Sequence, residues 1–190
     1  MDDFRRELRD MLVRRSVKVG GPFTLTSGRT SDFYIDTKLT TTSARGMVAV
    51  GNVLCDLLAA QGVAPDAVCG LTLGADPILG AISYASVLRG RPIDHLIIRK
   101  EPKGHGTKRW IEGSLDGIVS VVVVDDVWTT GGSTLKAVTA AREAGLKILA
   151  AMALVDREEG AQEALAEFAT FAAYTKTELL AAHRVLHSQG

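Results

Sequence analysis

The stretch that decides the fold is VVVVDDVWTTGGST, residues 121–134. Its run of valines is typical of a strand that is buried on both faces, as in a parallel sheet covered by helices. Residues 133–145, STLKAVTAAREAG, have the apolar spacing of a helix that ends at Gly145. A polar turn with two glycines joins the strand to the helix. The stretch therefore predicts a strand–turn–helix unit of an α/β protein.

Similar units follow one another from residue 43 to the end of the chain. The expected strands are continuous apolar runs, which favours a parallel sheet with helices on both faces. They lie at residues 66–71, 95–99, 118–126 and 148–156, with a weaker strand at 171–175. We therefore predict a doubly wound α/β core over residues 43–190.

The N-terminal part of the chain has a different pattern. Apolar residues between positions 4 and 12 share one face of a helix, and Gly20, Gly21 and Pro22 then interrupt the chain. Residues 23–39, FTLTSGRTSDFYIDTKL, are rich in threonine, aromatic and β-branched residues around a Ser-Gly pair, which predicts a hairpin. We expect residues 1–42 to form a small hood on the core, within one domain over residues 1–190.

Composition argues against several kinds of partner. Lys plus Arg and Asp plus Glu both total 22, so the net charge is zero, whereas nucleic-acid binders are usually basic. The N-terminal residues lack the apolar stretch of a signal peptide, and the longest apolar run, residues 148–155, is too short to span a bilayer. Cys55 and Cys69 match no zinc or redox spacing and are expected to be buried. We expect a cytoplasmic protein without nucleic-acid or membrane partners.

The turn at residues 129–133 has the composition of an anion site. Ligands of parallel sheets bind beyond the carboxyl ends of the strands. A helix N-terminus at that edge exposes unpaired N–H groups, and glycines let a phosphate approach the backbone closely. Hydroxyls add further donors; they belong to Thr129, Thr130, Ser133 and Thr134. The alternative, that Ser133 caps a helix and the acids are a polar strand end, accounts for fewer of these residues.

Two carboxylates, Asp125 and Asp126, precede the anion site. A carboxylate beside a bare phosphate is repelled, but beside hydroxyl groups or a cation it is stabilised. The ligand should therefore carry a phosphate and vicinal hydroxyls, and should come with Mg²⁺. A phosphoribose meets these requirements. The Walker A and dinucleotide patterns are both absent from the stretch.

Four segments together resemble the orotate phosphoribosyltransferase family. VVVVDDVWTTGG resembles the signature with which type I phosphoribosyltransferases bind phosphoribosyl diphosphate (PRPP). FTLTSGRTSDFYID resembles the family's N-terminal substrate segment, RKEPKGHG its mobile catalytic loop, and VDREEG its orotate-contacting segment. The four segments run from residue 23 to residue 160, so the resemblance covers most of the chain.

The resemblance implies a reaction, an ion and a partner. The phosphoribosyl group of PRPP would pass to orotate, which gives orotidine 5′-monophosphate and pyrophosphate on the route to UMP. Mg²⁺ would be bound mainly through PRPP or pyrophosphate, so no metal site made by protein side chains is expected. A homodimer with shared active sites would have Arg99, Lys103 and His105 act on the neighbouring subunit, and Lys100 within its own chain.

The resemblance also assigns site residues. The groups expected at the reaction centre are Lys103, His105, Asp125 and Asp126. Residues expected to bind PRPP are Arg99, Lys100, Lys103, His105, Asp125, Asp126, Val127, Trp128, Thr129, Thr130, Gly131, Gly132 and Ser133. Thr129 and Arg157 would bind orotate. Without the resemblance, Arg157 would be a surface arginine paired with an adjacent glutamate.

Some positions depart from the family pattern or leave alternatives open. Thr26 stands where many relatives have lysine, and Gly74 lies in a loop that often carries one. Asp76 fits a helix cap better than a water-mediated Mg²⁺ ligand. Trp128 replaces the usual aliphatic residue, for a reason the sequence does not give. The alternative functions are transfer to another base and a non-catalytic PRPP-sensing regulator.

Overall fold

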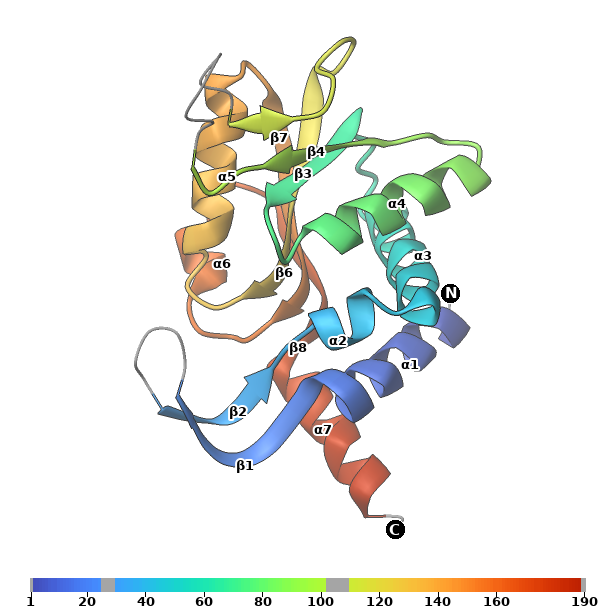
Figure 1. Cartoon of the computed structure of the whole chain (residues 1–190), viewed down its shortest axis with the longest axis vertical. Coiled ribbons are helices and arrows are strands. Elements are labelled where there is room, and N and C mark those ends of the chain that lie inside the picture. Colours follow the sequence, from blue (N-terminus) through green and yellow to red (C-terminus); the bar gives the residue numbers. More distant parts are fainter. Residues whose placement is uncertain (1, 25–29, 102–109, 189–190) are drawn as a thin grey trace.

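A mostly parallel six-stranded sheet forms the centre of the molecule (Figure 1). The computed structural model describes residues 2–24, 30–101 and 110–188. The strand order is β5-β4-β3-β6-β7-β8, and β5 is the antiparallel strand. The strands are β3 (Ala67–Leu71), β4 (Asp94–Ile98), β5 (Ile111–Glu112), β6 (Ser120–Trp128), β7 (Lys147–Asp156) and β8 (Thr170–Thr175). The predicted doubly wound α/β core is confirmed.

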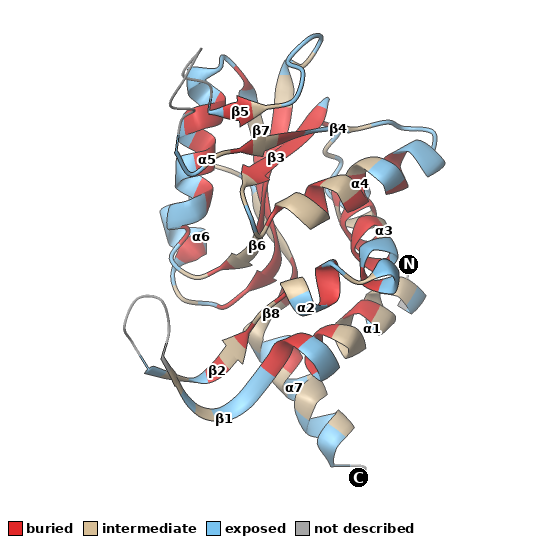
Figure 2. Ribbon diagram, in the orientation of Figure 1, coloured by how far each residue is buried: buried red, intermediate tan, exposed pale blue. Residues whose placement is uncertain are grey.

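Helices cover both faces of this sheet. The helices α3 (Ala44–Ala60) and α4 (Asp76–Leu88) lie on one side, and α5 (Gly132–Glu143) and α6 (Ala161–Ala164) on the other (Figure 1). β6 supplies the core on both sides because successive strand residues alternate between faces. Val122 and Val124 pack with the α3 and α4 cluster, and Val121 and Val123 with the α5 cluster. Buried residues accordingly concentrate along the strands and the inner helix faces (Figure 2).

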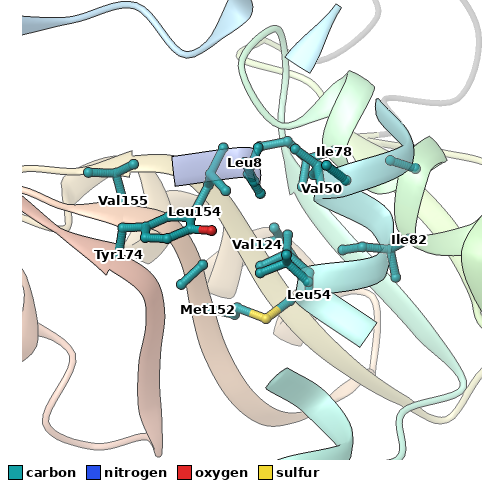
Figure 3. Packing of buried hydrophobic residues seen from close by; sticks show 14 of the residues in the cluster. Leu8, Val50, Leu54, Ile78, Ile82, Val124, Met152, Leu154, Val155 and Tyr174 are labelled. Atoms are coloured by element: carbon teal, nitrogen blue, oxygen red, sulfur yellow. The ribbon is translucent and has the colours of Figure 1, made fainter. Parts of the chain in front are cut away.

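The N-terminal segment joins the α3 side of the core. The helix α1 (Asp2–Met11) packs against α3 and against the final helix α7 (Lys176–His187). Leu8 lies in the same buried cluster as Val124, Met152 and Tyr174 (Figure 3). The Tyr174 hydroxyl also donates a hydrogen bond to the backbone carbonyl of Arg5 at 2.6 Å. The N-terminal helix and the C-terminal strand and helix are therefore in direct contact.

The hood is a two-stranded antiparallel sheet of β1 (Val17–Thr24) and β2 (Thr30–Ile35). The expected pairing is present, but the expected break at Gly20–Pro22 is wrong, because these residues lie inside β1. They form an irregularity in the register between Val19 and Phe23, and Gly20 has a φ of 92° that favours glycine. Thr26 and the turn around it lie outside the described residues.

Two short helices connect the hood to the core. They are η1 (Leu12–Ser16), a single π-helical turn, and α2 (Lys38–Thr41). The hydroxyls of Ser16 and Thr40 hydrogen-bond at 2.8 Å and are both buried, so the two short helices are fixed to each other. None of the described helices combines the length and apolarity needed to cross a membrane. Cys55 and Cys69 are free and buried, as expected.

Candidate active site

The two acids at the end of β6 face opposite sides of the sheet, as consecutive strand residues do. On the α5 side, Asp125 Oδ2 accepts a hydrogen bond from Thr134 Oγ1 at 2.9 Å. On the hood side, Asp126 Oδ2 accepts one from Thr37 Oγ1 at 2.8 Å. Asp125 is 7% exposed, whereas Asp126 is more open to solvent. Different parts of the chain therefore hold the two acids.

The environment of Asp125 disfavours its charge. Burial, and secondly the charge of Asp126, raise the pKa of Asp125 to about 7 from its ordinary 3.8. The hydrogen bond from Thr134 acts in the opposite direction because it stabilises the ionised form. Without ligand, this carboxyl therefore binds a proton more readily than an ordinary aspartate, and its charge state depends on the donors around it.

The turn between β6 and α5 leaves a helix N-terminus open. The N-cap is Gly131 with a φ of 81°, and no described side chain caps this end of the helix. The interpretation of Ser133 as a cap is therefore wrong, because it is the second residue inside α5. Thr130, Gly132 and Ser133 are exposed at this end. The first-turn N–H groups and three exposed positions together form a surface suited to an anion.

Trp128 points away from this surface. Its side chain is fully buried among the small side chains of β7 and α6, Ala151, Ala153 and Ala161, with Leu165 beside them. Its carbonyl accepts a hydrogen bond from the backbone N–H of Arg157 at 2.9 Å. Trp128 is predicted among the PRPP-binding residues, but its indole lies in the core. Only the backbone of Trp128 is therefore placed to contact a ligand.

A loop after β3 passes directly over Asp126. A Cβ built on Gly74 would lie 2.5 Å from both Cγ and Oδ1 of Asp126, so a side chain at this position would force the acid or the loop to shift. The peptide bond between Thr72 and Leu73 in this loop is cis. The sequence marks Gly74 only as a position in a loop where many relatives carry lysine, and it indicates no role for the glycine itself. Its proximity to the acid depends on a β3–β6 contact that no local pattern encodes.

Asp76 does not cap α4 as expected. The N-cap is Ala75, and Asp76 Oδ2 instead accepts a hydrogen bond from Thr72 Oγ1 at 2.6 Å. This contact joins the two ends of the loop that passes over Asp126. Asp76 Oδ1 is buried without a hydrogen-bond partner in the described part of the chain.

Arg157 follows β7 beside the β6–α5 turn. Its side chain is 5% exposed and pairs with Glu159 through Nη2 at 2.7 Å, so it is not a surface arginine. Its Nε is buried and has no hydrogen-bond partner within residues 2–24, 30–101 and 110–188. Arg157 and Lys176 lie 5.8 and 5.6 Å from the ring of Phe33, which is itself fully buried. A buried guanidinium with an unused donor is suited to a carboxylate ligand.

The basic segment after β4 is described at its ends. Arg99 Nη1 pairs with Glu112 at 2.9 Å, and the Arg99 backbone N–H donates to the Trp110 carbonyl at 2.8 Å. Lys100 is exposed. Lys103 and His105, expected at the reaction centre, lie outside the described residues.

Metal-binding side chains do not cluster in the described structure. No group of three or more His, Cys, Asp or Glu residues there could hold an ion. His183 and His187 are stacked with ring centroids 4.0 Å apart on α7. His187 Nδ1 is 2.9 Å from the His183 carbonyl oxygen.

Known proteins share this chain's sequence and fold. No family model matches it. The orotate phosphoribosyltransferase of Aquifex aeolicus is 46% identical over 161 residues, which cover 84% of this chain and 87% of that protein. The crystal structure of the Mycobacterium tuberculosis H37Rv orotate phosphoribosyltransferase in complex with Fe(III) dicitrate has a TM-score of 0.80 at 39% identity, covering 93% and 98% of the two chains. Its complex with PRPP has a TM-score of 0.76 at 34% identity, with the same coverage.

The sheet order, the paired acids and the open helix N-terminus define a type I phosphoribosyltransferase. A relative with 46% identity over most of both chains places it more closely. The chain belongs to the orotate phosphoribosyltransferase family and is a pentosyltransferase enzyme.

Proposed function

We propose that the enzyme transfers the phosphoribosyl group of PRPP to orotate, which releases pyrophosphate and forms orotidine 5′-monophosphate for UMP synthesis. The observation that carries this is the joint placement of two acids and an uncapped helix N-terminus at the end of one strand. The M. tuberculosis relative, whose complex with PRPP is known, has the same fold.

Each part of PRPP has a suitable group in the site. The 5′-phosphate would bind the backbone and hydroxyls of residues 129–133, where exposed donors surround the start of α5. Asp125 and Asp126 would accept hydrogen bonds from the ribose hydroxyls, with Val127 and Trp128 contributing backbone. Lys100 and, from the neighbouring subunit, Arg99, Lys103 and His105 would neutralise the pyrophosphate as it leaves.

Orotate has a carboxylate, and Arg157 has a buried guanidinium with a free Nε. Thr129 is the first residue of the turn and directly follows Trp128, whose carbonyl accepts a hydrogen bond from the Arg157 backbone N–H. We therefore assign the orotate carboxylate to Arg157 and a hydroxyl contact to Thr129. Phe33 packs beneath Arg157 and supports its guanidinium.

The acids also fit the chemistry of the transfer. Substitution at an anomeric carbon passes through an oxocarbenium-like transition state, which nearby negative charge stabilises. The attacking atom is N1 of orotate, so no enzyme nucleophile is needed. Lys103 and His105 would hold charge or a proton at the leaving pyrophosphate.

Mg²⁺ fits this site as an ion carried by the substrate. Mg²⁺ prefers oxygen ligands and usually keeps several waters, so diphosphate oxygens and water would hold it here. When bound, it would neutralise charge on the diphosphate.

We also assign the enzyme to the cytoplasm and to a homodimer. Tyr84, Val87 and Leu88 are 65%, 59% and 71% exposed. Their spacing places them on one face of α4. An apolar ridge of this kind supports contact with a second copy, which would bring each basic segment to the neighbouring site.

The function is tested by following orotate absorbance with purified enzyme, PRPP and Mg²⁺. We expect PRPP-dependent loss of orotate with equimolar pyrophosphate release. Adenine and uracil serve as competing bases under the same conditions and should not be consumed. Turnover of either base in place of orotate, or no turnover at all, would overturn the proposal.

A further inference from the structure

A buried chain of hydrogen bonds ends on Asp125. Trp128 Nε1 lies 2.9 Å from Thr134 Oγ1, and Thr134 Oγ1 lies 2.9 Å from Asp125 Oδ2. Trp128 is fully buried and Thr134 is 1% exposed, so both contacts are shielded from water. The second oxygen, Asp125 Oδ1, accepts a bond from the Asp126 backbone N–H at 3.0 Å. Both oxygens of Asp125 are therefore fixed by the protein.

The direction of this chain follows from the chemistry of its members. An indole N–H can only donate, so the Thr134 oxygen must accept from Trp128. The single hydroxyl proton of Thr134 is then free to point at Asp125 Oδ2. The indole thereby locks the hydroxyl into the orientation in which it donates to the carboxylate. Each carboxylate oxygen keeps a further lone pair for a ligand hydroxyl.

Packing alone does not account for this arrangement. A threonine inside a helix can bond to the carbonyl of the residue four positions earlier. Thr139 on the same helix does so, with its hydroxyl 3.0 Å from the Leu135 carbonyl. Thr134 instead directs its hydroxyl out of the helix to the end of β6. A valine would fill the same volume without this contact.

We propose that Trp128 and Thr134 are positioning residues, which hold the Asp125 carboxylate so that its free lone pairs meet a ribose hydroxyl of PRPP. This inference rests on the proposed role of Asp125. Neither side chain touches substrate, because both are buried beneath the acid. Their effect should therefore appear in PRPP binding and turnover, and not in orotate binding.

The test compares steady-state constants of wild type with Thr134→Val, Thr134→Ser, Trp128→Phe and Asp125→Asn. Thr134→Val should raise the KM for PRPP by about tenfold or more, as expected for a hydrogen bond to a charged group, and change the KM for orotate less than about twofold. Thr134→Ser keeps the hydroxyl and should restore most of the loss. Thr139→Val is the matched control and should behave as wild type.

Trp128→Phe keeps the ring in the core and frees the Thr134 hydroxyl to rotate. It should raise the KM for PRPP by about threefold. If Thr134→Val does not fold, this variant alone tests whether the buried hydrogen bonds position Asp125. A folded Thr134→Val or Trp128→Phe enzyme with a wild-type KM for PRPP would overturn the inference. If only Asp125→Asn has a raised KM for PRPP, Asp125 binds PRPP but Thr134 and Trp128 do not position it. If Asp125→Asn has a wild-type KM for PRPP, Asp125 itself has no role in binding PRPP. Absence of orotate turnover by wild type would refute the proposed function.

Discussion

The Thr37 hydroxyl donates a hydrogen bond of 2.8 Å to Asp126 Oδ2, across 89 residues of sequence. Thr37 is fully buried and belongs to the segment that links the hood to α2. Asp126 sits at the end of the central strand, so this bond connects the hood to the site directly. The position of one acid therefore depends on how the N-terminal segment is seated.

Replacing Thr37 tests this connection. Thr37→Val should reduce kcat/KM for PRPP by about tenfold, because a hydrogen bond to a charged group is lost and Asp126 is freed to move. Thr37→Ser should retain most activity. Thr42→Val is the control, since the Thr42 hydroxyl bonds the Lys38 carbonyl at 2.6 Å and is exposed. Equal kinetics for Thr37→Val and Thr42→Val would show that the bond does not position the acid.

Gly74→Ala should damage catalysis more than stability. The added methyl would lie 2.5 Å from the Asp126 carboxyl carbon and would push the acid aside. A displacement of about 1 Å in a catalytic group can cost on the order of a hundredfold in rate. Gly80→Ala in α4 is the control, because no described atom lies within 4 Å of its added Cβ. We expect Gly80→Ala to keep full activity and to melt slightly higher, as alanine favours a helix. Full activity of Gly74→Ala would contradict the close packing of the loop on Asp126.

The raised pKa of Asp125 predicts that the folding stability of the ligand-free protein depends on pH. Its folded pKa of about 7 lies above the unfolded value of about 3.9, so the folded protein binds more protons between these values. The free energy of unfolding should therefore fall as pH rises through this window, and Asp125→Asn should remove that fall. Denaturant unfolding at about pH 5 and about pH 7.5 measures the difference.

Asp66 serves as a control because its pKa is shifted in the opposite direction to that of Asp125. Hydrogen bonds from Ser120 and Val119 lower the pKa of Asp66. Its stabilising contribution should be present above about pH 4 and be lost as pH falls through its folded pKa. Asp66→Asn should therefore weaken the protein at neutral pH and leave the fall between pH 4 and 7 in place. A wild-type pH slope in Asp125→Asn would mean that Asp125 titrates normally.

Arg157→Lys should raise the KM for orotate by about tenfold or more and affect PRPP little, because lysine cannot form a planar bidentate pair with a carboxylate. Arg142→Lys is a close control. Like Arg157, Arg142 pairs with a glutamate, Glu167 at 2.5 Å, and lies near a phenylalanine ring, 5.0 Å from Phe168. Unlike Arg157, it is exposed, at the C-terminal end of α5. A shared loss in both variants would indicate a stability effect instead of an orotate contact.

The α4 ridge predicts where the homodimer forms. Leu88→Glu places a charge where the side chain is 71% exposed in the single chain and should shift the protein toward monomers in light scattering. Activity should fall with it if the sites are shared. Val185→Glu on α7, where the valine is 57% exposed, should leave the assembly intact. A dimer that survives Leu88→Glu must use another face.

The elements that the sequence predicted well are those whose signals are local. The valines of β6 and the glycine turn into α5 lie within one short stretch, and the structure places them as expected. The break at Gly20–Pro22 was misjudged because a bulge in an exposed two-stranded sheet tolerates residues that usually end strands.

The contacts around the two acids could not be predicted, because they join distant segments. Thr37 reaches Asp126 from the segment between the hood and α2, and Gly74 reaches it from the loop after β3. The role of Trp128 could be recognised only from its packing against β7, although the sequence contained two signals. Small residues at Ala151 and Ala153 on the next strand leave room for a large side chain, and Thr134 is a polar residue on a buried helix face.

The bond between Tyr174 and the Arg5 carbonyl spans 169 residues and affects how the protein is made. During synthesis α1 leaves the ribosome first, but its partner strand β8 is among the last segments to emerge. The helix can pack on α3 as soon as that helix has emerged, but Leu8 is fully enclosed only when β7 and β8 are also available. Chaperones that shield emerging apolar segments would meet the incompletely enclosed face of this N-terminal helix, and Thr37 could reach Asp126 only after β6 has emerged.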